Sequence, residues 1–116
     1  MSRDSILREK SAAYGRRIVK LGKYLKEEQR EFVLANQIVR SGTSIGANIA
    51  EAIYGSSRKD FIAKLRIAQK EASETLYWLD MIYSGEYISD RIYRSFDAEC
   101  CELLAMLAAS IKTACR

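Results

Sequence analysis

The sequence predicts an all-α protein, an antiparallel up-down-up-down four-helix bundle that occupies residues 1–116 as a single domain. Three observations predict this fold class. The chain contains no proline, the residue that costs about 3 kcal/mol inside a helix. Apolar residues recur at helical spacings of three and four in four segments. These segments, of about 20–28 residues, would measure roughly 30–42 Å each, and short connections join them.

The first predicted helix runs from about Ser5 to Lys26, with an apolar face and a cationic face. Its apolar face carries Leu7, Tyr14, Ile18, Leu21 and Leu25. At about 100° per residue, Arg16, Lys20 and Lys23 gather on the opposite face, so we expect them to face solvent. The polar stretch 26–31 is the expected connection to the next helix.

The second predicted helix runs from about Glu31 to Ile53 and has small residues beside its apolar stripe. The stripe consists of Leu34, Ile38, Ile45 and Ile49. Gly42 and Gly46 stand four residues apart on its flank, a spacing that lets a neighbouring helix backbone approach closely. We therefore expect tight helix packing at these two glycines.

The third and fourth helices are marked by turn and capping residues. Gly55 is expected to close the second helix in a left-handed conformation, and Ser57 to cap the third, 58–84. Gly85 ends that helix, and Ser89 is a plausible cap for the fourth. The apolar face of the third helix carries Phe61, Leu65, Ala68, Ala72, Leu76, Leu79 and Tyr83. The fourth presents Ile92, Phe96, Cys100, Leu103, Leu107, Ile111 and Ala114.

The positive charge of the chain is concentrated in its first helix. The net charge is +4, yet residues 1–26 carry eight cations and two anions, a local +6, so the rest sums to −2. Such a surface attracts nucleic acid through phosphates, without reading sequence. The alternative is an ordinary solvated face; a membrane-surface role conflicts with the core position of the apolar face. The candidate nucleic-acid-binding residues are Arg8, Arg16, Arg17, Lys20, Lys23 and Lys26.

A set of polar residues borders the stripe of the second helix. By helical geometry Arg40, Ser44 and Glu51 lie within about 40° of one another. We interpret the set as a structural network in which Arg40 pairs with a carboxylate, since polar groups at helix contacts need partners. A binding surface for a partner or a phosphate is the alternative. The network comprises Arg40, Ser41, Ser44, Asn48, Glu51, Glu71 and Glu74.

The third helix has a second apolar stripe outside its core face. It consists of Ile67, Trp78 and Ile82, and one helix can hardly bury two such stripes in its own bundle. Excess apolar surface of this kind favours contact between subunits, with Trp78 as an anchor. A cofactor pocket is the weaker alternative, and we expect no cofactor.

Signatures of an enzyme, a metal site or a membrane protein are missing from the sequence. There is no histidine, no phosphate-binding glycine loop and no nucleophile elbow, so we predict no catalytic residues. The thiols Cys100, Cys101 and Cys115 have neither disulfide nor zinc spacing and are expected to be buried or half-buried. No apolar run approaches the ~20 residues that span a bilayer, and no signal peptide is evident. The expected location is the cytoplasm.

The motifs of the second and third helices resemble those of one bacterial family. Residues 40–51 read Arg-Ser-Gly-Thr-Ser-Ile-Gly-Ala-Asn-Ile-Ala-Glu, and residues 57–61 read Ser-Arg-Lys-Asp-Phe. Together with residues 67–79, they resemble the "four helix bundle protein" family, also called 23S rRNA intervening-sequence proteins. The resemblance spans nearly the whole chain. Ala52 stands where many members have glycine, which favours a longer second helix.

The resemblance implies an antiparallel four-helix bundle that assembles into a ring, typically a homopentamer. Some family members are encoded within insertions in ribosomal RNA genes. A related branch, the accessory variability determinant of diversity-generating retroelements, forms a basic barrel that binds a reverse transcriptase and nucleic acid. We therefore expect a non-enzymatic, ring-forming scaffold that binds RNA, DNA or a nucleic-acid enzyme through basic surfaces. A protein–protein adaptor without a nucleic-acid role is the alternative.

Overall fold

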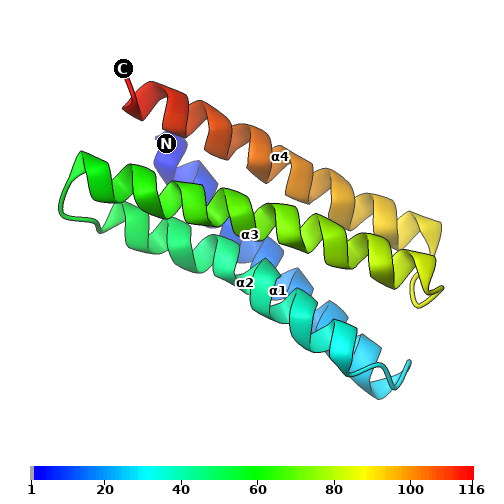
Figure 1. Cartoon of the computed structure of the whole chain (residues 1–116). Coiled ribbons are helices and arrows are strands. Elements are labelled where there is room, and N and C mark those ends of the chain that lie inside the picture. Colours follow the sequence, from blue (N-terminus) through cyan, green and yellow to red (C-terminus); the bar gives the residue numbers. More distant parts are fainter. Residues whose placement is uncertain (1) are drawn as a thin grey trace.

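A computed structural model describes residues 2–116, and within them the chain forms four long helices. They are α1 (Arg3–Glu27), α2 (Val33–Ile53), α3 (Arg58–Ser84) and α4 (Asp90–Ala114). Each helix runs opposite to the one before it, and short loops join them at alternate ends of the molecule (Figure 1). Helix α2 packs on α1 and α3, and α4 packs on α3 and α1. The predicted four-helix bundle is confirmed.

Serine caps begin three of the four helices. The hydroxyls of Ser2, Ser57 and Ser89 accept hydrogen bonds from backbone N–H groups in the first turns of α1, α3 and α4. Helix α2 starts at Val33, two residues later than predicted, and lacks a side-chain cap at Phe32. Instead the Leu34 N–H donates to Glu31 Oε2 at 2.7 Å. Helix α1 starts at Arg3, two residues earlier than predicted, because Ser2 caps it. The starts of α3 and α4 therefore agree with the prediction, and those of α1 and α2 each differ by two residues.

The left-handed backbone positions differ from the prediction. Gly55 does not have a positive φ; the two residues that do, among residues 2–116, are Arg30 (55°) and Glu86 (66°). A Cβ at Gly55 would lie 2.5 Å from Asp60 Oδ2 and 3.0 Å from the Ala52 carbonyl oxygen. Gly55 therefore provides space for the start of α3 rather than an unusual backbone conformation.

The core is formed by the stripes that the sequence predicted, with a few departures. All five residues of the predicted apolar face of α1 are buried, including Tyr14, whose hydroxyl donates to the Phe96 carbonyl oxygen at 3.0 Å. In α2 and α3, residues at the ends of the stripes are half-buried, namely Leu34, Phe61 and Tyr83, and so is Leu76 within the α3 stripe. Ile92 is 39% exposed because it lies in the first turn of α4, at the end of the bundle.

Helices α1 and α2 approach closely at their glycines. A Cβ at Gly42 would lie 2.8 Å from Ile18 Cγ1, and one at Gly46 would lie 3.3 Å from the backbone of Ser11. On the other helix, a Cβ at Gly22 would lie only 2.3 Å from Val39 Cγ2. The tight packing expected at Gly42 and Gly46 is therefore present, with Gly22 as a third contributor.

This packing predicts opposite effects for two Gly→Ala substitutions. Replacing glycine by alanine inside a helix raises the free energy of unfolding by about 1 kcal/mol. Overpacking the contact with a neighbouring helix lowers it by about 1–3 kcal/mol. Gly42→Ala should therefore lower the free energy of unfolding in urea by about 1 kcal/mol. Gly15→Ala is the matched control, because the new Cβ would lie at an ordinary contact distance of 3.9 Å from Thr43 Cα. This substitution should therefore raise the free energy of unfolding. Equal stabilisation by both substitutions would contradict the close approach.

Candidate nucleic-acid interface

The cations of α1 fall into two groups according to whether they pair with a carboxylate of α4. Lys10 forms an ion pair with Glu102 at 2.5 Å, and Arg17 pairs with Glu99. The Arg17 guanidinium also lies over the Phe96 ring, 4.1 Å from its centroid. Arg17, a candidate nucleic-acid-binding residue from the sequence, is therefore held against α4.

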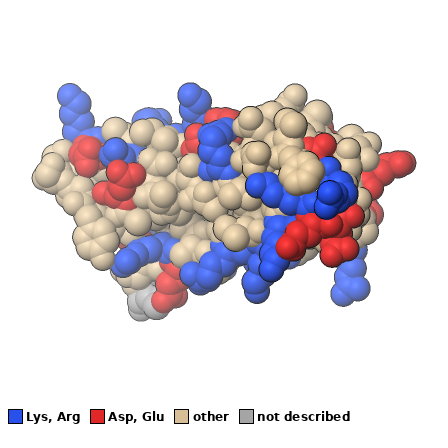
Figure 2. Space-filling view, turned by 90° about the horizontal axis from the view of Figure 1, so that it is seen from below, with Lys and Arg blue, Asp and Glu red and all other residues tan. Residues whose placement is uncertain are grey.

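The other cations of α1 have no carboxylate partner within residues 2–116. Arg16, Lys20 and Lys23 are exposed, as predicted from the helical wheel. Arg8 is also exposed and lies 5.3 Å from the Tyr54 ring centroid, and Lys26 is half-buried. We call Arg8, Arg16, Lys20, Lys23 and Lys26 the basic strip. Figure 2 shows that Lys and Arg lie along the whole length of one face of the molecule, with Asp and Glu in smaller groups.

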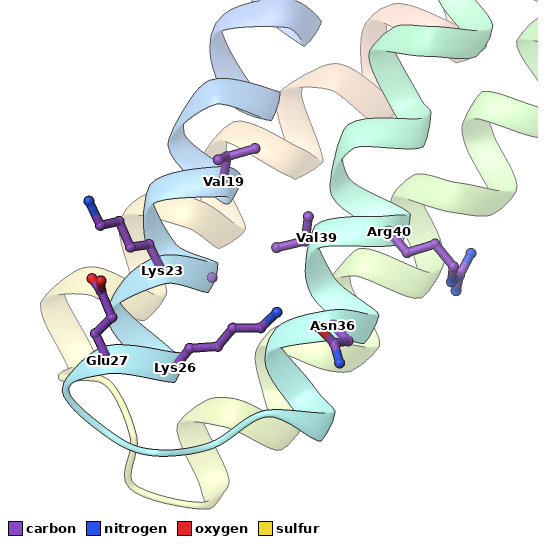
Figure 3. A pocket seen from close by; sticks show the side chains of 8 residues that line it. Val19, Lys23, Lys26, Glu27, Asn36, Val39 and Arg40 are labelled. Carbon is purple, nitrogen blue, oxygen red and sulfur yellow. The ribbon is translucent and has the colours of Figure 1, made fainter.

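A cavity of about 510 Å³ lies between α1 and α2 at one end of the basic strip. Its lining residues are Val19, Gly22, Lys23, Lys26, Glu27, Asn36, Val39 and Arg40. Val19 and Val39 project into it from the two helices, and Lys26 extends from α1 toward α2 (Figure 3). Lys23 and Glu27 project from the other side of α1, and Arg40 points away from the cavity (Figure 3).

A smaller cavity of about 310 Å³ continues along the same two helices. The two cavities share Val19, which is 50% exposed although it is apolar. Neither cavity was predicted from the sequence. The signal that could have indicated them is an apolar residue at position 19, outside the core stripe and among the exposed cations.

The predicted polar network centres on Arg40. Its guanidinium donates to Glu74 Oε1 at 2.7 Å and to Glu71 Oε2 at 3.2 Å, which joins α2 to α3. The hydrogen bond with Glu74, more than any other contact, raises the pKa of Arg40 above its usual value. Glu51, the third carboxylate considered, lies 3.7 Å from Lys64 instead. Because two carboxylates already occupy the Arg40 guanidinium, this geometry favours a structural role over phosphate binding.

The remaining polar residues of α2 are satisfied within the bundle. Ser44 donates to the Arg40 carbonyl oxygen at 2.6 Å, and Asn48 donates to the Ser44 carbonyl oxygen at 2.8 Å. Ser41 is fully buried and accepts a 3.0 Å hydrogen bond from the hydroxyl of Thr75 on α3. Thr75 was not predicted; the signal for it is a polar residue between Ala72 and Leu79 on the buried face.

The second apolar stripe of α3 differs from the prediction at one residue. Ile67 is 41% exposed, and Trp78 is half-buried. Ile82 is completely buried, because it lies seven residues after Thr75 on the core face, and it cannot contact another subunit. Next to Trp78, Tyr77 is 55% exposed, and its ring packs edge-on against Trp78 at a centroid distance of 5.0 Å.

The thiols do not form a site. Cys100 is buried, and burial raises its pKa to about 12, which makes the thiol unreactive at neutral pH. Cys101 and Cys115 are exposed, contrary to expectation, because one points outward from α4 and the other follows its end.

Residues 2–116 contain no cluster of three acidic or thiol side chains that could hold a metal ion. In the same range no helix has the length and apolar character needed to cross a membrane.

Fold and surface together define a helical bundle whose first helix carries cations paired with α4 on one side and unpaired cations on another. The chain belongs to the family described as 23S rRNA-intervening sequence protein, whose model matches residues 3–109. A crystal structure from Bacteroides thetaiotaomicron, a protein of unknown function from the S23 ribosomal protein family, is 49% identical. The match covers 96% of this chain and 99% of that chain, with a TM-score of 0.94. A comparison with curated proteins found no match.

The Arg40 network predicts a measurable loss of stability when it is broken. Arg40→Gln leaves Glu71, whose side chain is only 13% exposed, without its cation. We expect the free energy of unfolding to fall by about 1–2 kcal/mol, since hydrogen bonds between charged groups are among the stronger ones. Arg94→Gln is the control, because Arg94 pairs with Asp90 in an exposed i,i+4 pair and its loss should cost under about 0.5 kcal/mol. Equal losses in urea unfolding would argue against a structural network.

Proposed function

We propose that this protein is a non-enzymatic scaffold that assembles into a ring and binds nucleic acid through the basic strip of α1. The single observation that carries the proposal is the lack of acidic partners, within the described residues, for the five cations of the strip. Cations that serve the fold are normally paired, as Lys10 and Arg17 are. Unpaired cations in a row are available to phosphates.

The strip favours binding that is independent of base sequence. Lysine and arginine side chains neutralise backbone phosphates and release counterions, which gives affinity but little discrimination between bases. A ring multiplies the strip by the number of subunits, so that weak contacts on several copies act together. The homopentamer implied by the family resemblance would present five such strips.

A nucleic-acid enzyme is the protein partner that we propose for the same surface. The resemblance to the branch that works with a reverse transcriptase supports this partner class. In such an assembly the ring would hold the nucleic acid while the partner enzyme supplies the chemistry. The chain itself would contribute no catalytic residue.

A protein–protein adaptor without nucleic-acid binding is the second candidate function. The observation that favours it is the exposed apolar surface of α3, where Ile67 and Tyr77 are 41% and 55% exposed. The same surface could instead join the subunits of the ring. Salt dependence separates the two functions, because an apolar interface is far less sensitive to salt than phosphate binding.

The proposed nucleic-acid function predicts that binding depends on the salt concentration. The triple variant Arg16→Gln, Lys20→Gln, Lys23→Gln should bind single-stranded RNA more weakly, and the slope of log K against log salt should fall by about 2, at about 0.7 per lost contact. Fluorescence anisotropy at several salt concentrations measures both quantities. For a matched pair, Lys20→Gln should raise Kd severalfold and Lys10→Gln should not, although each removes one lysine charge from α1. If neither RNA nor DNA binds at low salt, the nucleic-acid function is excluded.

The proposed ring predicts the mass of the protein in solution. Light scattering at micromolar concentration should give a mass several times the chain mass of 13.2 kDa, and five times for a pentamer. Ile67→Glu should reduce this mass, because a buried unpaired carboxylate opposes association. Ile92→Glu is the control, since Ile92 is equally exposed on a different helix. A monomer mass for the unmodified protein would exclude the ring.

A further inference from the structure

We infer that the 510 Å³ cavity between α1 and α2 receives an unpaired base of a single-stranded nucleic acid. This inference rests on the proposed function and specifies its ligand class: single strands rather than duplexes. It assigns a role to two features that the bundle does not use for its own stability. These are the exposed apolar side chain of Val19 and the half-buried Lys26 that reaches across the cavity.

The floor of the cavity is apolar and closely packed. Val19 from α1 and Val39 from α2 form its walls, and Gly22 lies between them. Because Gly22 has no side chain, Val39 can approach α1 so closely that a Cβ there would meet Val39 Cγ2 at 2.3 Å. The faces of a nucleobase are apolar, so these methyl groups offer a surface from which a base displaces water.

The rim of the cavity provides hydrogen-bonding groups suited to the edge of a base. Lys26 brings three N–H donors across the cavity from α1, and the exposed Asn36 amide on α2 offers both donors and an acceptor (Figure 3). Arg40 contributes only its stem, because its guanidinium is held by Glu71 and Glu74. This combination matches the donors and acceptors that an unpaired base exposes on its Watson–Crick edge.

The surroundings of the cavity indicate where the sugar–phosphate backbone would lie. Lys23 projects from α1 on the side away from the cavity, toward solvent (Figure 3). With Lys20 and Arg16 it continues the basic strip along α1, beside the smaller cavity that also contains Val19. A single strand along α1 can therefore place phosphates on these cations and turn a base inward between the helices.

The size of the site and the chemistry of duplexes exclude a paired base. A volume of about 510 Å³ lies within the range of small-ligand sites, so one base with its sugar fits. In a duplex the Watson–Crick edge is occupied and the base faces are stacked, and extracting a base costs several kcal/mol. The charge that reaches across the cavity favours nucleic acid over a partner helix as the occupant, because it is the cation Lys26, whereas Lys23 and Glu27 project from the other side of α1 (Figure 3).

The test compares oligonucleotides that differ only in their bases. A single-stranded DNA of twelve thymidines and an abasic backbone of the same length and charge are titrated into the full-length protein at low salt. We expect the strand with bases to bind about tenfold more tightly, because burying the apolar face of a base against the two valines is favourable. A duplex of the same length has no unpaired base to offer. Its affinity per contacted phosphate should therefore equal that of the abasic strand.

Variants of the cavity locate the effect. The double variant Val19→Leu, Asn36→Leu narrows the cavity, removes the amide and leaves the charge unchanged; it should lose the tenfold preference and keep abasic binding. Val33→Leu is the matched control, because Val33 is an exposed valine of α2 outside the cavity, and it should retain the preference. Circular dichroism tests whether each variant folds, and light scattering tests whether it assembles to the same mass as the unmodified protein.

The remaining outcomes separate the two proposals. Equal binding of thymidine and abasic strands by the unmodified protein overturns the base site but leaves the nucleic-acid function intact. No binding of any strand at low salt overturns the nucleic-acid function, and the base site with it. If the double variant keeps the preference but changes the mass of the oligomer, the cavity is an interface between copies and the base site is excluded.

Discussion

The close approach of α1 and α2 is the constraint on which the rest of the structure depends. At Gly22 and Gly42 the missing side chains make room for Val39 and Ile18 of the other helix, and at Gly46 a Cβ would lie 3.3 Å from the backbone of Ser11. This contact fixes how α1 is rotated about its own axis relative to the bundle. Because the rotation is fixed, the apolar stripe of α1 faces the core, Lys10 and Arg17 face α4, and the basic strip faces solvent.

The same contact explains why a bundle with a well-filled core still has hollows on its surface. Glycines bring the helix backbones together but provide no side chains to cover the seam on its outer side. The seam therefore holds two cavities, with Val19 between them. Elsewhere the helices are joined by larger groups, such as the Arg40 ion pairs and the buried Thr75–Ser41 hydrogen bond between α2 and α3.

Much of the fold could be predicted from the sequence, because helical periodicity and serine caps are local signals. The bounds of α3 and the buried stripe of α1 follow directly from them. Features that depend on a neighbouring helix were harder to predict. Arg17 looked like the other cations of α1, and only its position opposite Glu99 and Phe96 separates it from them.

Two further errors have the same origin. Ile82 was grouped with Ile67 by composition, although its register on the helix places it in the core. Gly55 was interpreted as a left-handed residue, whereas the side chain of Asp60 on the next helix is what limits position 55. The cavity next to the basic strip could not be predicted from periodicity, since it depends on how far apart two helices lie.

The start of α2 has a consequence for the motions of the molecule. This helix has no serine at its N-terminus, and it follows a left-handed Arg30 that is strained relative to glycine. The Glu31 side chain holds the Leu34 N–H, but the chain enters the helix from the strained Arg30, so amide hydrogens near Val33 should exchange with solvent readily. Asn36 lies in the next turn, so transient fraying there would widen the cavity mouth and give a ligand a way in without disturbing the glycine contact.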